Sequence, residues 1–336
     1  MRKINYFLII LFLVFPDVNW GQNPYYYNID RTNGLPSNSV YDIFQDSKGF
    51  MWFATGKGLC RYDGNVFKTY TSDSQTSKSG SCIREDSFGR IWYCNFDGYL
   101  YYVENGELKS LSQKESRGYI KYSIIKNKLF LMQLNGVIVY DLKSLKPIYF
   151  YPLTDINIRS TYSVGSKFYI VGDYIYEIDY PKKIKKHELS DDFKKNLEVP
   201  IVQVIKDELF IVSKYSNYYY TYKENKLTRK EFSNSFDFIQ NVALTDNAPW
   251  LCTPNGIIKY ENNKATYYFS EYNVSYIFKD KQQNYWISTL NNGLLFIQDF
   301  KNNFIPLDPK PTIFSPYNNQ LLTGTENDLI YGLQLN

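Results

Sequence analysis

The sequence predicts an all-β protein, a seven-bladed β-propeller of four-stranded blades. Aromatic residues make up 18% of the 336-residue chain, with 34 Tyr and 23 Phe, and this composition favours strands over helices. Large aromatic residues recur about every 40 residues, each followed by a turn that in most units contains glycine. A repeat of that length is typical of a propeller blade and too long for a leucine-rich or ankyrin unit.

One aromatic position, which we call the anchor, sets the repeat. Trp52, Trp92 and Trp250 each precede a glycine by six residues, and the middle units have Phe or Tyr at the corresponding place. The full series is Trp52, Trp92, Phe130, Tyr169, Phe210, Trp250 and Trp286. Blades are stable only when stacked, so we interpret the anchors as core residues between blades and not as stacking platforms for a sugar or a base.

The first unit shows how a blade is built. Four segments, residues 38–44, 50–55, 59–63 and 65–70, have the composition of short strands, with Gly, Asp and Ser at the turns. Residues 25–30 precede this unit, and we predict that they complete the last blade, because a propeller closes its ring by pairing the two ends of the chain. We assign the propeller to residues 22–315, and residues 316–336 to a closing strand or to the start of a further module.

The first 21 residues predict a secretory signal peptide. Arg2 and Lys3 precede an apolar run from Ile4 to Phe15, which is too short to span a bilayer. The protein is therefore expected to be periplasmic or secreted. The net charge of +4 is small for the length, and the Lys-rich segment 181–189 is followed by acidic residues, so we expect a solvated loop there and no nucleic-acid partner.

Residues that could support catalysis are scarce. His187 is the only histidine, and the chain has neither the Cys/His spacing of a metal site nor a phosphate-binding loop. We therefore expect no enzyme activity, metal or cofactor, although two acids meeting at the mouth of a propeller would escape sequence analysis. Cys82 and Cys94 lie on opposite arms of a predicted hairpin, so they form either a disulfide or two small apolar core residues.

The first repeat resembles a known family. The segments "GLPSN", "DSKGFMWFAT" and "GLCRYDG" between residues 34 and 64 are similar to those of two-component regulator propellers, the periplasmic sensor region of Bacteroidetes-type histidine kinases and hybrid two-component systems. Members usually continue into a second propeller, an immunoglobulin-like module, a membrane helix and a kinase or DNA-binding output. None of these is present in the 336 residues.

The resemblance implies a ligand-sensing module of a sensor histidine kinase, with the chain as its N-terminal fragment. Kinase activity would then reside in downstream domains, which would be the partners of this module, and the full-length receptor could be a dimer. The alternative is a secreted propeller that acts as a protein or polysaccharide interaction module.

The predicted ligand-binding residues lie in the loops that join the second and third strands of the blades. In a propeller these loops gather on one face around the central axis. Their polar residues are Lys57, Asn95, Asp97, Asn135, Asp173, Asn217, Asn255, Asn291 and Asn292. One interpretation is that Asn and Asp only form tight turns. The other is a polar face that recognises a glycan, a peptide or another small ligand, since an amide both donates and accepts hydrogen bonds.

Overall fold

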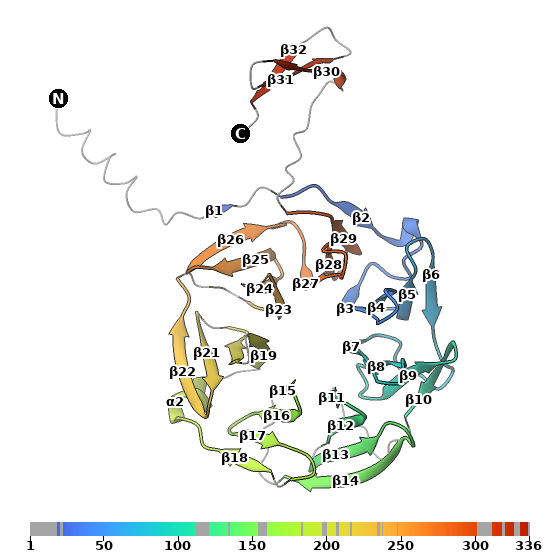
Figure 1. Cartoon of the computed structure of the whole chain (residues 1–336), viewed down its shortest axis with the longest axis vertical. Helices are drawn as coiled ribbons and strands as arrows, with labels where there is room; N and C mark the ends of the chain where they lie inside the picture. The colour runs from blue at the N-terminus through green and yellow to red at the C-terminus, as the bar shows by residue number, and fades with distance from the viewer. Residues whose placement is uncertain are drawn as a thin grey trace, which may run out of the picture.

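The computed structural model describes residues 19–20, 23–111, 121–133, 135–153, 160–182, 184–196, 200–205, 208–215, 217–233, 236, 238–246, 248–300, 311–317, 320–325 and 330–334. Within these ranges the chain is nearly all β-structure, and seven antiparallel sheets form a ring (Figure 1). The prediction of an all-β, seven-bladed propeller is confirmed.

Each blade is numbered here in chain order, and its strands run from the axis outward. Blade 1 contains β3 (Val40–Gln45), β4 (Met51–Thr55), β5 (Gly58–Tyr62) and β6 (Phe67–Tyr70). Blade 2 contains β7 (Gly80–Glu85), β8 (Ile91–Asn95), β9 (Leu100–Glu104) and β10 (Glu107–Ser110). Blade 3 contains β11 (Tyr122–Ile125), β12 (Lys128–Gln133), β13 (Gly136–Asp141) and β14 (Lys146–Pro152). Blade 4 contains β15 (Ser160–Val164), β16 (Lys167–Val171), β17 (Ile175–Ile178) and β18 (Lys185–His187).

The other three blades follow the same plan. Blade 5 contains β19 (Pro200–Ile205), β20 (Glu208–Ser213), β21 (Tyr218–Lys223) and β22 (Lys226–Glu231). Blade 6 contains β23 (Asn241–Thr245), β24 (Ala248–Thr253), β25 (Gly256–Glu261) and β26 (Lys264–Tyr268). Blade 7 contains β27 (Val274–Lys279), β28 (Tyr285–Thr289), β29 (Leu294–Ile297) and, as its outer strand, β2 (Tyr27–Ile29).

The ring is closed by a strand from the N-terminal side of the chain. β2 pairs antiparallel with β29, with Tyr27 opposite Phe296 and Ile29 opposite Leu294. This is the pairing that the sequence predicted for residues 25–30. It joins the two ends of the ring through backbone hydrogen bonds, so that blade 7 is held together by segments that are far apart in the sequence.

The anchors lie at the interfaces between blades. Each points toward the next blade, and the last points back to the first: Trp52, Trp92, Phe130, Tyr169, Phe210, Trp250 and Trp286 each contact the apolar cluster shared with the following blade. Six of them are buried, and Tyr169 is half-buried. Neighbouring residues on a strand point to opposite faces, so Phe53 packs on blade 7 with its ring centroid 5.7 Å from that of Trp286.

A buried aspartate holds the anchor in three blades. Asp46, Asp86 and Asp280 accept the indole N–H of Trp52, Trp92 and Trp286 at 2.8, 2.7 and 2.9 Å. In blade 1 the other oxygen of this aspartate accepts the backbone N–H of Lys48 and Phe50 at 3.0 and 2.9 Å, which shapes the turn between β3 and β4. The sequence indicated only the turn. The carboxylate also satisfies an N–H that the stacked blades remove from water.

None of the four cysteines, all of which the structure describes, forms a disulfide. A β-bulge in β7 puts Ser81 opposite Cys94, so Cys82 is displaced from the position that the sequence suggested for it. Cys60, Cys94 and Cys252 are buried among apolar side chains. Of the two interpretations that the sequence allowed, a disulfide or small apolar core residues, the second applies to these three cysteines.

Residues 311–334 contain a separate sheet. β30 (Pro311–Tyr317), β31 (Gln320–Thr325) and β32 (Ile330–Gln334) lie outside the ring (Figure 1), and among the described residues they pair only with one another. Because β2 closes the ring, residues 316–336 do not supply the closing strand. The sheet also begins at Pro311, before the boundary that the sequence suggested, and Ile313 and Ile330 are 65% and 75% exposed on it.

Three short elements complete the described part. β1 (Asn19–Trp20) runs parallel to β26, η1 (Arg31–Asn33) follows β2, and α2 (Asp191–Asn196) connects blades 4 and 5. Most of the expected signal peptide, residues 1–18 and 21, lies outside the described residues, so the signal peptide stays a prediction.

Candidate functional site

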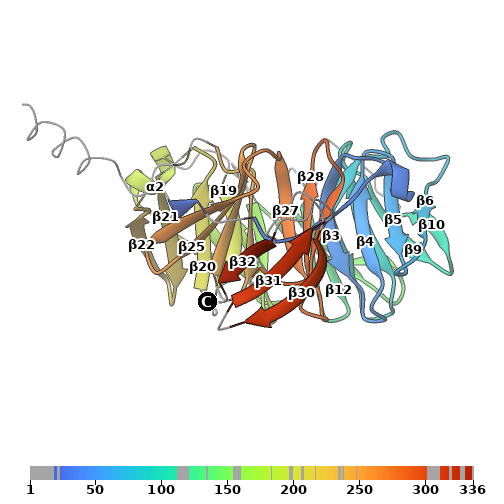
Figure 2. The same ribbon diagram turned by 90° about the horizontal axis from the view of Figure 1, so that it is seen from above.

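The blade topology puts the predicted loops on one face of the ring. In a four-stranded antiparallel blade the connection between strands 2 and 3 lies at one end, and the other two hairpin connections lie at the opposite end. Figure 2 shows the strands running between these two faces. We call the face with the loops between strands 2 and 3 face A, and the opposite face B. The connections between blades also lie on face A.

A threonine hydroxyl closes the loop on face A in three blades. Thr55, Thr253 and Thr289 donate to the carbonyl oxygens of Gly58, Gly256 and Gly293 at 2.8, 2.9 and 3.0 Å. The same hydroxyls accept the backbone N–H of Lys57, Asn255 and Asn292 at 3.1, 3.2 and 2.8 Å. The turn is therefore formed by the threonine and by glycine, and not by the side chains of Asn255 and Asn292.

The predicted binding residues differ in exposure. Seven have exposed side chains on face A: Lys57, Asp97, Asn135, Asn217, Asn255, Asn291 and Asn292. Asp173 is half-buried. Asn255, Asn291 and Asn292 do not have a positive φ, so the tolerance of asparagine for left-handed backbone does not explain their presence.

Asn95 is not exposed on the predicted binding face. It is completely buried, its Nδ2 donates to the carbonyl oxygen of Ser77 at 3.0 Å, and its Oδ1 accepts the backbone N–H of Tyr99 at 2.7 Å. Asn95 stands three residues after its anchor, as Thr55 does in blade 1, so it takes the place of the turn-forming threonine. Comparing the repeats at that position would have revealed its role.

Sequence analysis missed the aromatic residues of face A. Phe96 and Tyr99 in the β8–β9 loop are 39% and 37% exposed, and Tyr215 in the β20–β21 loop is 61% exposed. The ring of Phe96 lies 4.9 Å from that of Tyr41, edge to face. Aromatic residues beside Asn and Asp in "NFDGY" and "KYSN" were the available signal. A face that carries both exposed polar side chains and exposed rings suits a ligand with both hydroxyl groups and apolar edges.

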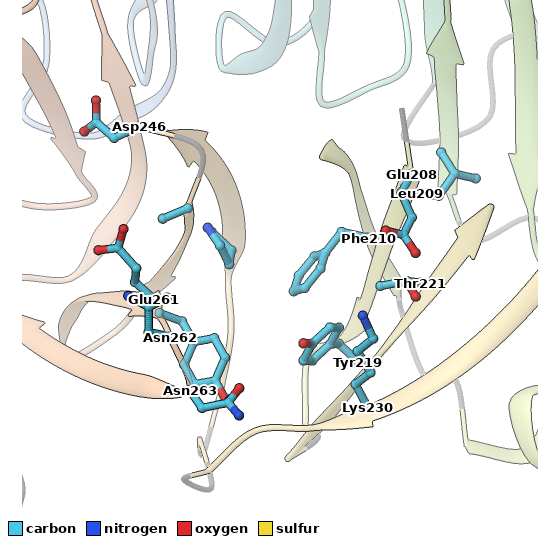
Figure 3. Close-up of a pocket in the computed structure, with 13 residues that line it drawn as sticks. Glu208, Leu209, Phe210, Tyr219, Thr221, Lys230, Asp246, Glu261, Asn262 and Asn263 are labelled. Atoms are coloured by element: carbon cyan, nitrogen blue, oxygen red, sulfur yellow. The ribbon is translucent and has the colours of Figure 1, made fainter. Parts of the chain in front are cut away.

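Face B carries a cavity of about 420 Å³ between blades 5 and 6. Figure 3 shows Phe210, Tyr219 and Lys230 of blade 5 on one side, and Glu261 and Asn263 of blade 6 on the other. Because these residues come from the outer strands and the B-side turns, the cavity lies away from the predicted loops. The sequence did not predict it, since it exists only where two blades stack.

Asp246 lines both this cavity and a second one, of about 620 Å³, between blades 6 and 7. The carboxylate of Asp246 accepts Lys279 Nζ at 2.5 Å and the hydroxyl of Tyr285. Partial burial works against ionisation of Asp246, but these two hydrogen bonds outweigh it and lower the pKa of the carboxyl. Asp246, Lys279 and Tyr285 are thus paired with one another within the protein.

The single histidine lies at the outer rim of the ring, at the face A end of its strand. His187 is on β18, the outermost strand of blade 4, with its Nε2 3.8 Å from Glu177 Oε2. No group of three or more His, Cys, Asp or Glu side chains in the described part of the chain is arranged to hold a metal ion. Among the helices of that part, none is long and apolar enough to cross a membrane.

Comparisons with known proteins support the resemblance seen in the sequence. A family model described as "Two component regulator propeller" matches residues 34–57. A protein named histidine kinase P4, from Formosa agariphila, is 36% identical over 81 residues, which are 24% of this chain and 6% of that protein. The chain therefore corresponds to a small part of that relative's length.

Solved structures share the fold. The extracellular domain of a hybrid two-component system from B. thetaiotaomicron matches with a TM-score of 0.65 at 20% identity, over 93% of this chain and 48% of the other. Virginiamycin B lyase from Staphylococcus aureus matches with a TM-score of 0.65 at 13% identity, over 81% and 97%. At such identities the matches show the fold alone. Together with the family match at residues 34–57 they confirm the resemblance to two-component regulator propellers that the sequence indicated, and the chain has the fold of the extracellular domains of two-component systems.

Proposed function

We propose that the chain is an exported propeller module that senses a ligand for a two-component receptor, and that face A binds the ligand. One observation carries the assignment to face A. Threonine hydroxyls form the turns of blades 6 and 7, so the side chains of Asn255, Asn291 and Asn292 remain exposed without a role in the turn. Exposed amides and exposed aromatic rings on the same face favour a hydroxyl-rich ligand such as a glycan.

The rest of the receptor is part of the same proposal. The chain spans 48% of the extracellular domain that it matches and 6% of the related histidine kinase, which supports its assignment as the N-terminal part of a longer receptor. Downstream sensor and kinase domains would then be its partners, and a dimer would form in the complete receptor. Sequencing the coding region in frame beyond residue 336 tests this part. A stop codon there, together with stable secreted protein, would favour the secreted interaction module instead.

We further propose that the propeller binds without catalysis. The fold match to a lyase raises the enzyme alternative, but the position of His187 on an outer strand argues against a histidine-based site on either face. Mass analysis of bound ligands recovered after prolonged incubation tests this point, and a chemically altered ligand would support the enzyme alternative.

Binding to face A is tested by titrating the purified chain with a panel of glycans and short peptides. The variant with Asn255→Ala and Asn291→Ala is expected to bind its ligand about tenfold more weakly, because two exposed hydrogen-bonding groups are lost. Asn65→Ala is the matched control, since Asn65 is an exposed asparagine in the turn between β5 and β6 on face B. Equal affinity of the double variant and the parent protein would refute the assignment to face A.

A further inference from the structure

The innermost strands form a rigid polar lining around the axis of the ring. β3, β7, β11, β15, β19, β23 and β27 surround it (Figure 1). Side chains on some of these strands bond to the backbone of the neighbouring strand: Gln203 Nε2 donates to Val242 O at 2.7 Å, and Ser275 Oγ donates to Val40 O at 2.5 Å. These bonds hold neighbouring blades in register, so groups that project to the axis are preorganised.

Three consecutive inner strands carry β-bulges at a corresponding place. The register shifts between Val274 and Tyr276 in β27, between Val40 and Asp42 in β3, and between Ser81 and Arg84 in β7. In β7 the bulge includes Cys82 at a positive φ of 60°. A bulge redirects the side chains beside it, and bulges are frequent next to functional sites. The side chains that follow these three bulges are Tyr276, Asp42 and Arg84.

Arg84 lies on β7, the innermost strand of blade 2. Desolvation opposes its charge, but Asp42, Cys82, Tyr122 and Tyr276 outweigh it and raise the pKa of the guanidinium, which stays charged. Those groups belong to blades 1, 2, 3 and 7, and they can surround one guanidinium only near the centre of the ring. The side chain of Arg84 is nevertheless exposed, so solvent reaches it there.

The charge of Arg84 is not neutralised by a direct ion pair with Asp42. The two oxygens of Asp42 accept backbone N–H groups of Ile43 and Ile83 at 2.9 and 2.7 Å, and the two described side chains form no salt bridge. Arg84 itself donates from Nη1 to the carbonyl oxygen of Ile83 at 2.7 Å. A guanidinium has five N–H donors, so most of its donor capacity is left for other groups at the axis.

Further cations converge on the same region from face A. Lys121 precedes β11 in blade 3, and Lys214 follows β20 in blade 5. Burial lowers the pKa of Lys121, and the charges of Lys214 and Arg84 add to that effect. The charges of Arg84, Lys121 and Lys214, from blades 2, 3 and 5, are thus close enough to act on one another. Repulsion between like charges is unfavourable by itself and is reduced when an anion binds among them.

We propose that the axis beneath face A binds the carboxylate of a small ligand, either an acidic sugar or the C-terminus of a short peptide, with Arg84 as the principal contact. The planar fork of an arginine matches a carboxylate with two parallel hydrogen bonds. Lys121 and Lys214 supply additional positive charge, and the charge of Arg84 acts on the hydroxyl groups of Tyr162 and Tyr276. This inference rests on the proposed sensing function and adds the ligand's charge to it.

Calorimetric titration of the purified chain tests the proposal with two matched pairs of probes. D-galacturonate is compared with D-galactose, and a dipeptide with a free C-terminus is compared with its amide. One acid is expected to bind, and its neutral counterpart is expected not to; the pair that responds identifies the source of the carboxylate. Arg84→Gln should weaken binding of that acid by about tenfold or more, as for loss of a hydrogen bond to a charged group.

Two controls separate binding from folding. Lys48→Gln removes one positive charge from an exposed turn on face B and should leave the affinity unchanged. Tyr276→Phe removes only a hydroxyl group and should weaken binding while the near-ultraviolet circular dichroism spectrum stays that of the parent protein. Equal affinity for acid and neutral probe, or an Arg84→Gln variant that binds like the parent, overturns the proposal. The proposed sensing function stands even then, provided that the variant with Asn255→Ala and Asn291→Ala binds a neutral glycan more weakly than the parent protein does.

Discussion

The buried aspartates Asp86 and Asp280 differ in whether an arginine pairs with them, and the effect of that arginine on stability can be measured. Asp86 accepts Trp92 Nε1 at 2.7 Å and also Arg90 Nε at 2.7 Å, and the side chains of Asp86 and Arg90 are 0% and 6% exposed. Asp280 accepts Trp286 Nε1 at 2.9 Å and the backbone N–H of Asn284 at 2.8 Å, but it has no cation in the corresponding place. The same substitution at the two sites therefore isolates the effect of a buried arginine.

The free energy of unfolding that each substitution removes can be worked out from these contacts. Asp86→Ala removes the ion pair at 2.7 Å from the buried guanidinium of Arg90 and leaves it only the Glu104 carboxylate, which lies 3.7 Å away and is 34% exposed. Breaking a buried ion pair in this way costs about 3–5 kcal/mol. Asp280→Ala leaves neutral N–H groups unpaired, which costs about 1–3 kcal/mol. Arg90 also donates from Nη2 to Leu142 O at 2.5 Å in blade 3, so the loss at Asp86 should extend to the contact between blades 2 and 3.

Urea unfolding monitored by tryptophan fluorescence provides the assay. Asp86→Ala should lower the free energy of unfolding by about 2 kcal/mol more than Asp280→Ala. Adding Arg90→Met to Asp86→Ala should recover part of the loss, because the buried charge that lost its nearest partner is then removed. Equal losses at the two aspartates, or no recovery in the double variant, would refute the reasoning.

Two further predictions concern glycine and cysteine. Gly256 and Gly49 both have a left-handed backbone, with φ of 95° and 93°, but a Cβ at Gly256 would lie 2.4 Å from Tyr268 O whereas one at Gly49 meets nothing within 4 Å. Gly256→Ala should therefore lower the stability by about 1–3 kcal/mol more than Gly49→Ala in urea unfolding, and equal losses would contradict this. Burial raises the pKa of the Cys60 and Cys252 thiols, so a thiol reagent at pH 8 should label neither in the native protein and both after unfolding. Mass spectrometry of labelled peptides checks this, and rapid labelling of Cys252 in the native protein would be inconsistent with its burial.

Much of the fold could be predicted because its signals are local and repeated. The interval between Trp52 and the next anchor measures one blade, since every blade needs one large ring to fill the gap to its neighbour. The strand at residues 25–30 could be assigned to the last blade for a related reason: a ring built from one chain has two ends, and pairing them removes two exposed strand edges.

The candidate site was predicted less well, because a residue's type does not reveal which way it points. Asn95 and Asn255 have the same chemistry and lie in equivalent loops, yet Asn95 is buried as the turn-forming group and Asn255 is exposed. The difference is a shift of two positions relative to the anchor. The exposed rings of Phe96 and Tyr215 were missed because aromatic residues were assigned to the core throughout.

The sequence by itself determined the architecture: the repeat length, the number of blades, the interfaces filled by the anchors and the strand that closes the ring. Only the tertiary structure decided which side chains lie near one another at the centre of the ring. Arg84, Lys121, Tyr162 and Tyr276 belong to blades 2, 3, 4 and 7, and no local pattern relates them. They come together because seven blades close around one axis, which turns residues far apart in the chain into neighbours within the reach of electrostatic attraction and repulsion.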